Sequence, residues 1–419
     1  KLYAVDNGTA TFWILDVNKD GSMKFHDGYS KGKKIKFIKD KDNTSAKGPD
    51  AEGITVDDEG KVYLASERDN SNKGVNYNTI LMVDPNTQEN EIVASKEWDL
   101  TSSLPNVSAN MGIESVEYVN FKDIEGAILD KNTKETFDIK NYPNSINDGI
   151  FFVALEDNGF VYAYVLNNDG TYTLINEYDS KLGGAMSMDF DTYNKELWVM
   201  SDNGYKNLGA KIKFNNGTTS VEHLLPPTKL NVNGNYEGFA ISDVSYTRNG
   251  KRPVYRFEDG VASGALTIGS IASDYKKNYE VKGNKNEIEI TSGNNLVLTI
   301  DGDLNDLVSI YLDEKEIVNK NSYKIDVSNS TITINNEFLK TLEIKEHTIK
   351  IKMVDGEGSF SFKLTKEETK PNNPETPSEE NKESNNSKTY IIVTIVAVVL
   401  VIILGVLGVF LKKKFHKNK

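Results

Sequence analysis

Apolar residues in this chain fall in short runs of four to seven, separated by Asp-, Asn- and Gly-rich turns, from Lys1 to about Ile271. Residues 50–68 show the pattern most clearly, with the sequence Asp-Ala-Glu-Gly-Ile-Thr-Val-Asp-Asp-Glu-Gly-Lys-Val-Tyr-Leu-Ala-Ser-Glu-Arg. The pattern predicts two short strands joined by a tight Asp-Glu-Gly turn. Because few segments show a helical period, the sequence predicts an all-β fold for this region.

The same pattern returns along the chain as five units with up to four short strands each. The units are Lys1–Phe25, Glu52–Ala94, Ile113–Glu177 with an insertion at Lys122–Asp148, Met186–Leu225 and Tyr236–Ile271. Repeats of about 40–50 residues with several strands are typical of β-propellers, in which stacked neighbours bury the faces that one unit leaves open. The first unit lacks its innermost strand, so we expect about six blades, with the remainder upstream of Lys1. Glu91–Ala94 is predicted to close the second unit.

Acidic residues recur at equivalent places in these units. In an antiparallel pair, the start of one strand and the end of the next lie at the same sheet edge. The acids that open first strands are Glu52, Glu114 and Glu237, and those that close second strands are Asp6, Glu67, Glu156 with Asp157, Asp202, and Glu258 with Asp259. Both sets should therefore gather at one mouth of the propeller, although Met186 replaces the opening acid of the fourth unit. The closing acids are equally well explained as hairpin-turn residues, whereas Glu-Gly at a strand start is a poor turn signal and favours function.

Four motifs resemble the phytase-like family, described as having esterase-like activity of phytase. They are Ala-Glu-Gly-Ile-Thr-Val-Asp at 51–57, Tyr-Leu-Ala-Ser-Glu-Arg at 63–68, Tyr-Glu-Gly-Phe-Ala-Ile at 236–241 and Gly-Ala-Leu-Thr-Ile-Gly-Ser-Ile at 264–271. The resemblance covers Lys1–Ile271 and implies a secreted or surface propeller with phosphomonoesterase or esterase activity. The candidate catalytic residues that it suggests are Glu52, Glu67, Arg68 and Glu237.

An acidic mouth repels phosphate, so hydrolysis of a phosphoester there requires divalent cations that reverse the local field. Clustered carboxylates suit Ca²⁺ better than Zn²⁺. The candidate metal ligands are Glu52, Glu114, Glu237, Asp202 and Asp259, and Ca²⁺ is the expected cofactor. Arg68 is a candidate to hold a substrate oxygen.

Composition excludes several other functions. The net charge of −13 and the pI near 5.0 argue against a nucleic-acid partner, which requires a basic surface. The chain has no cysteine, so disulfides and thiolate chemistry are excluded. It also has no Gly-x-Ser-x-Gly elbow, and its four histidines show no metal-ligand spacing. Residues 16–27 partly match a calcium loop, but flanking strands favour a hairpin turn.

Beyond the propeller region (1–273), residues 279–366 carry longer alternating strands such as Thr348–Met353. About 85 residues with roughly seven strands is the size of an immunoglobulin-like β-sandwich. Residues 337–342 and 347–349 resemble Ig-like modules of Gram-positive surface enzymes, which implies a spacer.

The C-terminal end predicts a membrane anchor. Residues 367–388 are polar and Pro-containing, typical of a disordered stalk. Residues 390–411 form an apolar run long enough for one transmembrane helix, and the basic tail at 412–419 places that end in the cytoplasm. We therefore expect a single-pass protein of the bacterial cell surface with its N-terminal domains outside.

Two functions remain open, and a third possibility is that the calcium sites are purely structural. The first is metal-assisted hydrolysis of a small phosphorylated or ester substrate at the acidic mouth. The alternative is a non-catalytic propeller that binds a carbohydrate, peptide or host ligand at the cell surface. We expect a monomer in either case.

Overall fold

A computed structural model describes residues 1–19 and 21–366 of the chain. The predicted stalk, transmembrane helix and basic tail (367–388, 390–411 and 412–419) lie outside the described residues. Among those described, no helix has the length and apolarity needed to cross a bilayer. The α-helices are α1 (Phe121–Ile124) and α2 (Asn336–Leu339), and the 3₁₀ turns are η1 (Ile38–Asp40), η2 (Thr101–Ser103), η3 (Ile139–Asn141), η4 (Asn203–Tyr205), η5 (Val244–Tyr246), η6 (Ile290–Ser292), η7 (Leu304–Asp306) and η8 (Lys320–Ser322).

The predicted repeating units form five antiparallel sheets, apart from one parallel pairing. The first contains β1 (Leu2–Asp6), β2 (Thr11–Val17), β3 (Met23–Phe25), β4 (Lys33–Lys36) and β8 (Glu91–Val93). The second contains β5 (Pro49–Val56), β6 (Val62–Asp69), β7 (Asn76–Val83) and β9 (Lys96–Asp99). The third contains β10 (Ile113–Asn120), β13 (Gly149–Leu155), β14 (Phe160–Leu166) and β15 (Tyr172–Asp179). The fourth contains β16 (Ser187–Asp191), β17 (Glu196–Met200), β18 (Gly209–Asn215) and β19 (Thr218–Leu224), and the fifth β20 (Tyr236–Ile241), β21 (Lys251–Glu258) and β22 (Leu266–Ala272). The insertion adds the small pair β11 (Leu129–Asp130) and β12 (Glu135–Thr136).

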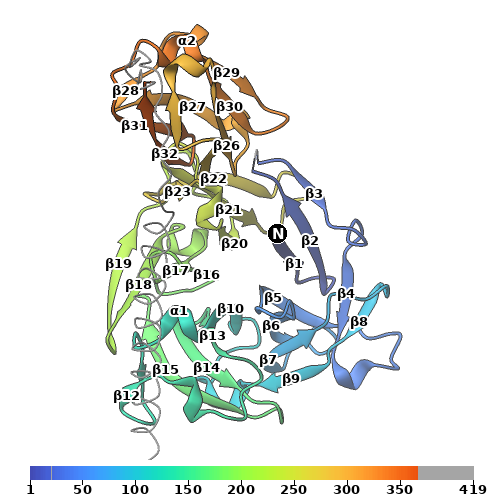
Figure 1. The fold of residues 1–419 in the computed structure, drawn as a ribbon. Helices are drawn as coiled ribbons and strands as arrows, with labels where there is room; N and C mark the ends of the chain where they lie inside the picture. The colour runs from blue at the N-terminus through green and yellow to red at the C-terminus, as the bar shows by residue number, and fades with distance from the viewer. Residues whose placement is uncertain (20, 367–419) are drawn as a thin grey trace, which may run out of the picture. The chain divides into compact units, whose positions relative to one another are not determined.

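These five sheets are arranged around a common centre, as in a propeller (Figure 1). The inner strands β5, β10, β16 and β20 pack against one another in that order, and β1 packs against β5. Side chains carried by strands distant in sequence are thereby brought close together at this centre.

Neighbouring sheets share hydrophobic cores. This explains why polar and apolar residues do not alternate along the second strands. In β13, Phe151 and Val153 pack towards the second sheet, while Ile150 and Phe152 pack towards the fourth. All seven residues of this strand are buried. A strand covered on both faces reads as a continuous apolar run, so stacking of sheets is what stabilises each unit.

Strand β8 corrects one sequence expectation. Glu91–Val93 does not close the second sheet; β8 pairs in parallel with β4 of the first sheet, and β9 takes the outer place beside β7. Ile92 is buried with Ile35 and Phe37 in the core between the first two sheets, and Lys36 forms an ion pair with Glu91 at 2.7 Å. Burial of Ile92 in this core therefore decides where β8 pairs, although β8 follows β7 of the second sheet in the sequence.

In the first sheet, the first strand, β1, takes the place that the second strand takes in the other sheets. β1 packs against β5, and the side chain of Asn7, directly after β1, donates a hydrogen bond to Glu52 of β5 (3.1 Å). Among the described residues the first sheet thus has no counterpart of β5, as the sequence indicated. The fifth sheet reaches the first through the Tyr246 hydroxyl, which donates to the carbonyl of Val17 at 3.0 Å. Six as the number of blades stays a prediction.

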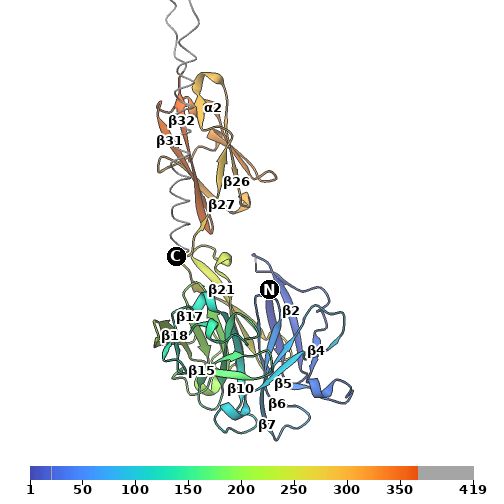
Figure 2. The ribbon, with the colours of Figure 1, turned by 60° about the horizontal axis from the view of Figure 1, so that its bottom comes forward.

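Residues 277–365 form two further sheets with a core of their own. One contains β23 (Lys277–Asn278), β25 (Glu287–Glu289), β27 (Leu307–Leu312), β28 (Lys315–Glu316), β31 (Glu346–Met353) and β32 (Gly356–Thr365). The other contains β24 (Val281–Gly283), β26 (Leu296–Ile300), β29 (Tyr323–Asp326) and β30 (Thr331–Ile334). Residues of both sheets, among them Leu298 and Ile351, pack in one cluster, and Figure 2 shows β26 facing β27 and β31. The two-sheet module was predicted; its assignment as immunoglobulin-like stays a prediction.

Close approach of two inner strands depends on Gly53. A Cβ atom at this position would lie 2.6 Å from the Cα of Ser115 and 2.8 Å from the backbone nitrogen of Val116. We expect Gly53→Ala to lower the free energy of unfolding by roughly 1–3 kcal/mol, because the backbone of β10 has to move. Urea unfolding of the wild type and the variant measures this loss.

Gly74→Ala is the matched control, because nothing lies within 4 Å of a Cβ atom there. It should leave stability unchanged or raise it by less than about 1 kcal/mol. Equal stability of the two variants would show that β5 and β10 do not require this contact.

Candidate active site

Glu52, Glu114 and Glu237 all occupy β-bulges at the start of inner strands. In the pairing of β5 with β6, Ala51 and Gly53 have partners and Glu52 is passed over. The register skips Glu114 in β10 and Glu237 in β20 in the same way. A bulge re-aims a side chain and interrupts the ladder, and bulges are common beside active sites. Three sheets therefore present their opening glutamate by the same backbone device.

Five carboxylates form a continuous group at the mouth, which we call the carboxylate cluster: Asp50, Glu52, Glu67, Glu114 and Glu156. Oxygen atoms of Asp50, Glu52 and Glu67 lie within 4.8 Å of one another, and so do those of Glu67, Glu114 and Glu156. Glu67 belongs to both triads. It sits at a register shift in β6, between Ser66 and Arg68.

Few hydrogen-bond donors face this negative charge. Glu67 accepts a hydrogen bond from the backbone N–H of Gly112 at 3.1 Å, and Glu52 accepts one from Asn7. Asn78 holds the Gly112 segment in place by accepting from the N–H of Ile113 at 2.8 Å. The exposed fractions of Glu67 and Glu114 are 2% and 7%, so water can do little to replace the missing hydrogen-bond donors.

The protonated forms of these glutamates are favoured as a result. Burial raises the pKa of Glu67 to about 7, although the Gly112 N–H and Arg68 act in the opposite direction. Burial, and then the charges of Asp50 and Glu67, raise the pKa of Glu52 well above its usual value. The pKa of Glu114 is raised in the same way, by burial and then by Glu52 and Glu67.

Arg68 is bound to protein groups. Its Nε donates to Asp50 at 2.6 Å, and its Nη1 donates to the carbonyl of Ala109 at 3.0 Å and lies 3.4 Å from Glu67. The sequence suggested that Arg68 holds a substrate oxygen. That role stays a prediction; the contacts seen here position Asp50 and Glu67 and offset part of their charge.

The other predicted site residues lie around the cluster. Glu237 accepts a hydrogen bond from the side chain of Asn235 at 2.9 Å, and burial followed by the charge of Asp259 raises its pKa to about 7. Asp202 caps η4 by accepting from the N–H of Tyr205, and its charge raises the pKa of Glu156. Asp259 is exposed. None of these three belongs to a carboxylate triad among the described residues.

The sequence did not point to two further acids, which lie on the inner strands. Glu117 of β10 accepts from the Thr55 hydroxyl at 3.1 Å and from the N–H of Phe190 at 3.3 Å. Asp189 of β16 accepts from the N–H of Ile241. These bonds join all four complete inner strands to their neighbours. Burial and then Asp189 raise the pKa of Glu117. A charged residue inside an inner strand was the available signal.

The cluster fits a hard divalent cation. Every donor in the two triads is a carboxylate oxygen, which Ca²⁺ and Mg²⁺ prefer to nitrogen or sulfur. Because the two triads overlap at Glu67, the cluster would hold one or two ions. Burial is the largest cause of the raised pKa values of Glu52 and Glu114, and the charges of the neighbouring acids add to it.

Comparison with known proteins gives one family match. Residues 2–174 match the model of the phytase-like family, described as esterase-like activity of phytase. The match includes all five members of the carboxylate cluster but ends before Glu237 and before residues 264–271. No curated protein sequence matches the chain. The family match and the five sheets together support a phytase-like propeller.

Solved structures show only distant similarity. A protein from Lactobacillus plantarum has 10% identity and a TM-score of 0.28, covering 84% of this chain and 95% of its own. The periplasmic gluconolactonase PpgL of Pseudomonas aeruginosa has 10% identity and a TM-score of 0.29, covering 86% and 94%. At such low TM-scores, neither structure informs the function of this chain.

The raised pKa of Glu67 predicts a pH-dependent stability. The folded state binds protons more tightly than the unfolded chain, so this stabilisation is complete below the unfolded pKa of about 4.5 and is lost as pH rises through about 7. With chelator present, the free energy of unfolding should fall between pH 5 and pH 8, by at most about 3 kcal/mol for this group.

Glu67→Gln should reduce that slope, since an amide oxygen still accepts from Gly112 and carries no charge. Denaturant unfolding at several pH values measures both proteins. Parallel profiles for the two would contradict the assignment of the slope to Glu67.

Proposed function

We propose that the carboxylate cluster is a divalent-cation-dependent hydrolytic centre that acts on a small phosphomonoester or ester. The observation that carries the proposal is the pair of carboxylate triads sharing Glu67, in which the acidic groups outnumber the hydrogen-bond donors that face them. The family match over residues 2–174 supports the same reaction class.

In this proposal the cluster holds Ca²⁺ through Asp50, Glu52, Glu67, Glu114 and Glu156. When bound, the cation supplies positive charge that attracts substrate oxygens and makes a bound water more acidic. Arg68 keeps Asp50 and Glu67 in place through its hydrogen bond and its ion pairs. It contributes the fixed positive charge of the apo site.

Glu237 is the residue proposed to move the proton. It lies outside both triads, its charge affects the pKa of Glu52 and Glu114, and its own pKa is about 7. A carboxyl group with a pKa near the working pH is well matched to general acid–base catalysis. The bond from Asn235 fixes the orientation of its carboxylate. Glu237 can therefore take a proton from water, and a bound cation would keep the triads ionised.

We further propose that the protein works as a monomer outside a bacterial cell, tethered by residues 390–411. This location is supported by the sequence of 390–419 alone. The rival function, binding of a carbohydrate, peptide or host ligand without catalysis, is distinguished by the following experiment.

Purified full-length protein should hydrolyse a model phosphomonoester or acyl ester, lose at least 100-fold of that activity on chelation, and regain it with Ca²⁺. Glu67→Gln should weaken calorimetrically measured Ca²⁺ affinity at least ten-fold. Glu237→Gln should lower kcat by 10²-fold or more with little change in that affinity.

Glu59→Gln is the control, because Glu59 is an exposed acid on the turn between β5 and β6 and loses the same charge. It should match the wild type in both measurements. Activity that persists in chelator would refute the metal-dependent centre, and an inert wild type that binds a glycan or peptide would establish the rival.

A further inference from the structure

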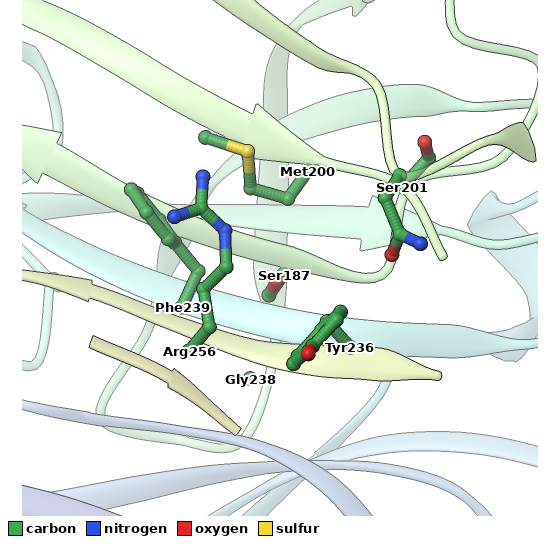
Figure 3. Close-up of a pocket in the computed structure, with 8 residues that line it drawn as sticks. Ser187, Met200, Ser201, Tyr236, Gly238, Phe239 and Arg256 are labelled. Atoms are coloured by element: carbon green, nitrogen blue, oxygen red, sulfur yellow. The ribbon is translucent and has the colours of Figure 1, made fainter. Parts of the chain in front are cut away.

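A small pocket lies between the fourth and fifth sheets, beside the mouth. Residues of β16, β17, β20 and β21 line it, together with Asn207, and two of them, Tyr236 and Gly238, flank Glu237 in the chain. Figure 3 shows Arg256 lying beside the ring of Phe239 in this pocket. The enclosed space holds roughly a water-sized group, so a ligand would place one small polar group inside.

Arg256 differs from every other arginine in the chain. Arg68, Arg248 and Arg252 form ion pairs with Asp50, Asp306 and Asp191 respectively. Within residues 1–19 and 21–366, the guanidinium of Arg256 has neither an ion pair nor a hydrogen bond. An unpaired cation is unexpected in a chain with a net charge of −13.

Aromatic stacking holds Arg256 without using its N–H groups. Its guanidinium carbon lies 5.2 Å from the centre of the Phe239 ring, its direct partner across β20 and β21. Phe239 stacks on Trp198 at 6.0 Å, with 20° between the planes. Stacking on an aromatic face leaves the edge of a guanidinium free to bind an oxyanion in a bidentate manner.

Two buried polar atoms in the pocket also lack partners among the described residues. They are the hydroxyl of Ser187 and the Oδ1 of Asn207, whose residues are 5% and 6% exposed. The amide nitrogen of Asn207 donates to the carbonyls of Val232 (3.0 Å) and Gly234 (3.1 Å), so Oδ1 is fixed as an acceptor. An unsatisfied buried polar atom costs about 1–3 kcal/mol.

We propose that this pocket binds a small oxyanion that carries a hydroxyl group, such as an α-hydroxycarboxylate or a phosphate retaining one P–OH. Arg256 binds the negative oxygens at the opening, and the hydroxyl enters the pocket, where it donates to Asn207 and accepts from Ser187. Burial lowers the pKa of Arg256 and no carboxylate opposes this effect, so a bound anion would stabilise the charged form. The inference goes beyond the proposed hydrolysis, since it would hold in a protein without catalysis.

The test is calorimetric titration of the full chain in chelator, which removes cations from the carboxylate cluster. Glycerate or inorganic phosphate should bind, with glycerate at least ten-fold tighter than propionate, which lacks the hydroxyl. Glycerol, which lacks the anion, should not bind. The phosphate titration distinguishes the two kinds of oxyanion.

Arg256→Met, which keeps the apolar stem over Phe239, should weaken binding at least ten-fold. Lys211→Met is the matched control: Lys211 lies over Trp198 in the same stack, at 5.3 Å, but does not line the pocket, and its loss should change affinity less than two-fold. Ser187→Ala should weaken binding about three-fold without lowering Tm, because it removes only an unpaired hydroxyl. The proposal is overturned if the wild type binds neither anion, or if Arg256→Met and Ser187→Ala bind as the wild type does.

Discussion

Mutual repulsion among buried carboxylates is the constraint on which the rest of the mouth depends. Two unit charges 4.8 Å apart interact by about 3 kcal/mol at an effective dielectric constant of 20. In the carboxylate cluster the acids of each triad lie within such distances of one another, and Arg68 supplies a nearby fixed cation. The remaining charge has to be neutralised in one of two ways. Either protons bind, which these carboxyl groups exchange near neutral pH, or cations bind.

The backbone geometry that creates this cluster interrupts the regular pairing of the strands. Each opening glutamate interrupts its ladder, and Gly53 has to lack a side chain so that β5 can approach β10. The hydrophobic cores between sheets hold the strands in these positions, because alternate residues of β13 are locked into two different cores. Packing further out along each sheet thus stabilises the irregular backbone at the rim, as expected near a functional site.

Sequence periodicity predicted most strands of the five sheets and the convergence of Glu52, Glu67 and Glu114. It succeeded because antiparallel hairpins carry equivalent strand ends to one edge. It could not assign β8, whose partner is chosen by burial of Ile92 in another sheet. It could not show that Arg68 is already paired, or that Glu117 and Asp189 link neighbouring inner strands, because these contacts depend on three-dimensional neighbours. The pocket beside Arg256 left no sequence signature at all.

The parallel pairing of β8 with β4 has a consequence for biosynthesis. The chain leaves the first sheet after β4, builds β5, β6 and β7, and returns to complete the first sheet before it lays down β9. A nascent chain that ends anywhere before Val93 therefore lacks part of two sheets at once. Non-local pairing of this kind delays closure and makes the two sheets assemble together. The first two sheets are interlocked in this way, and we expect them to fold together.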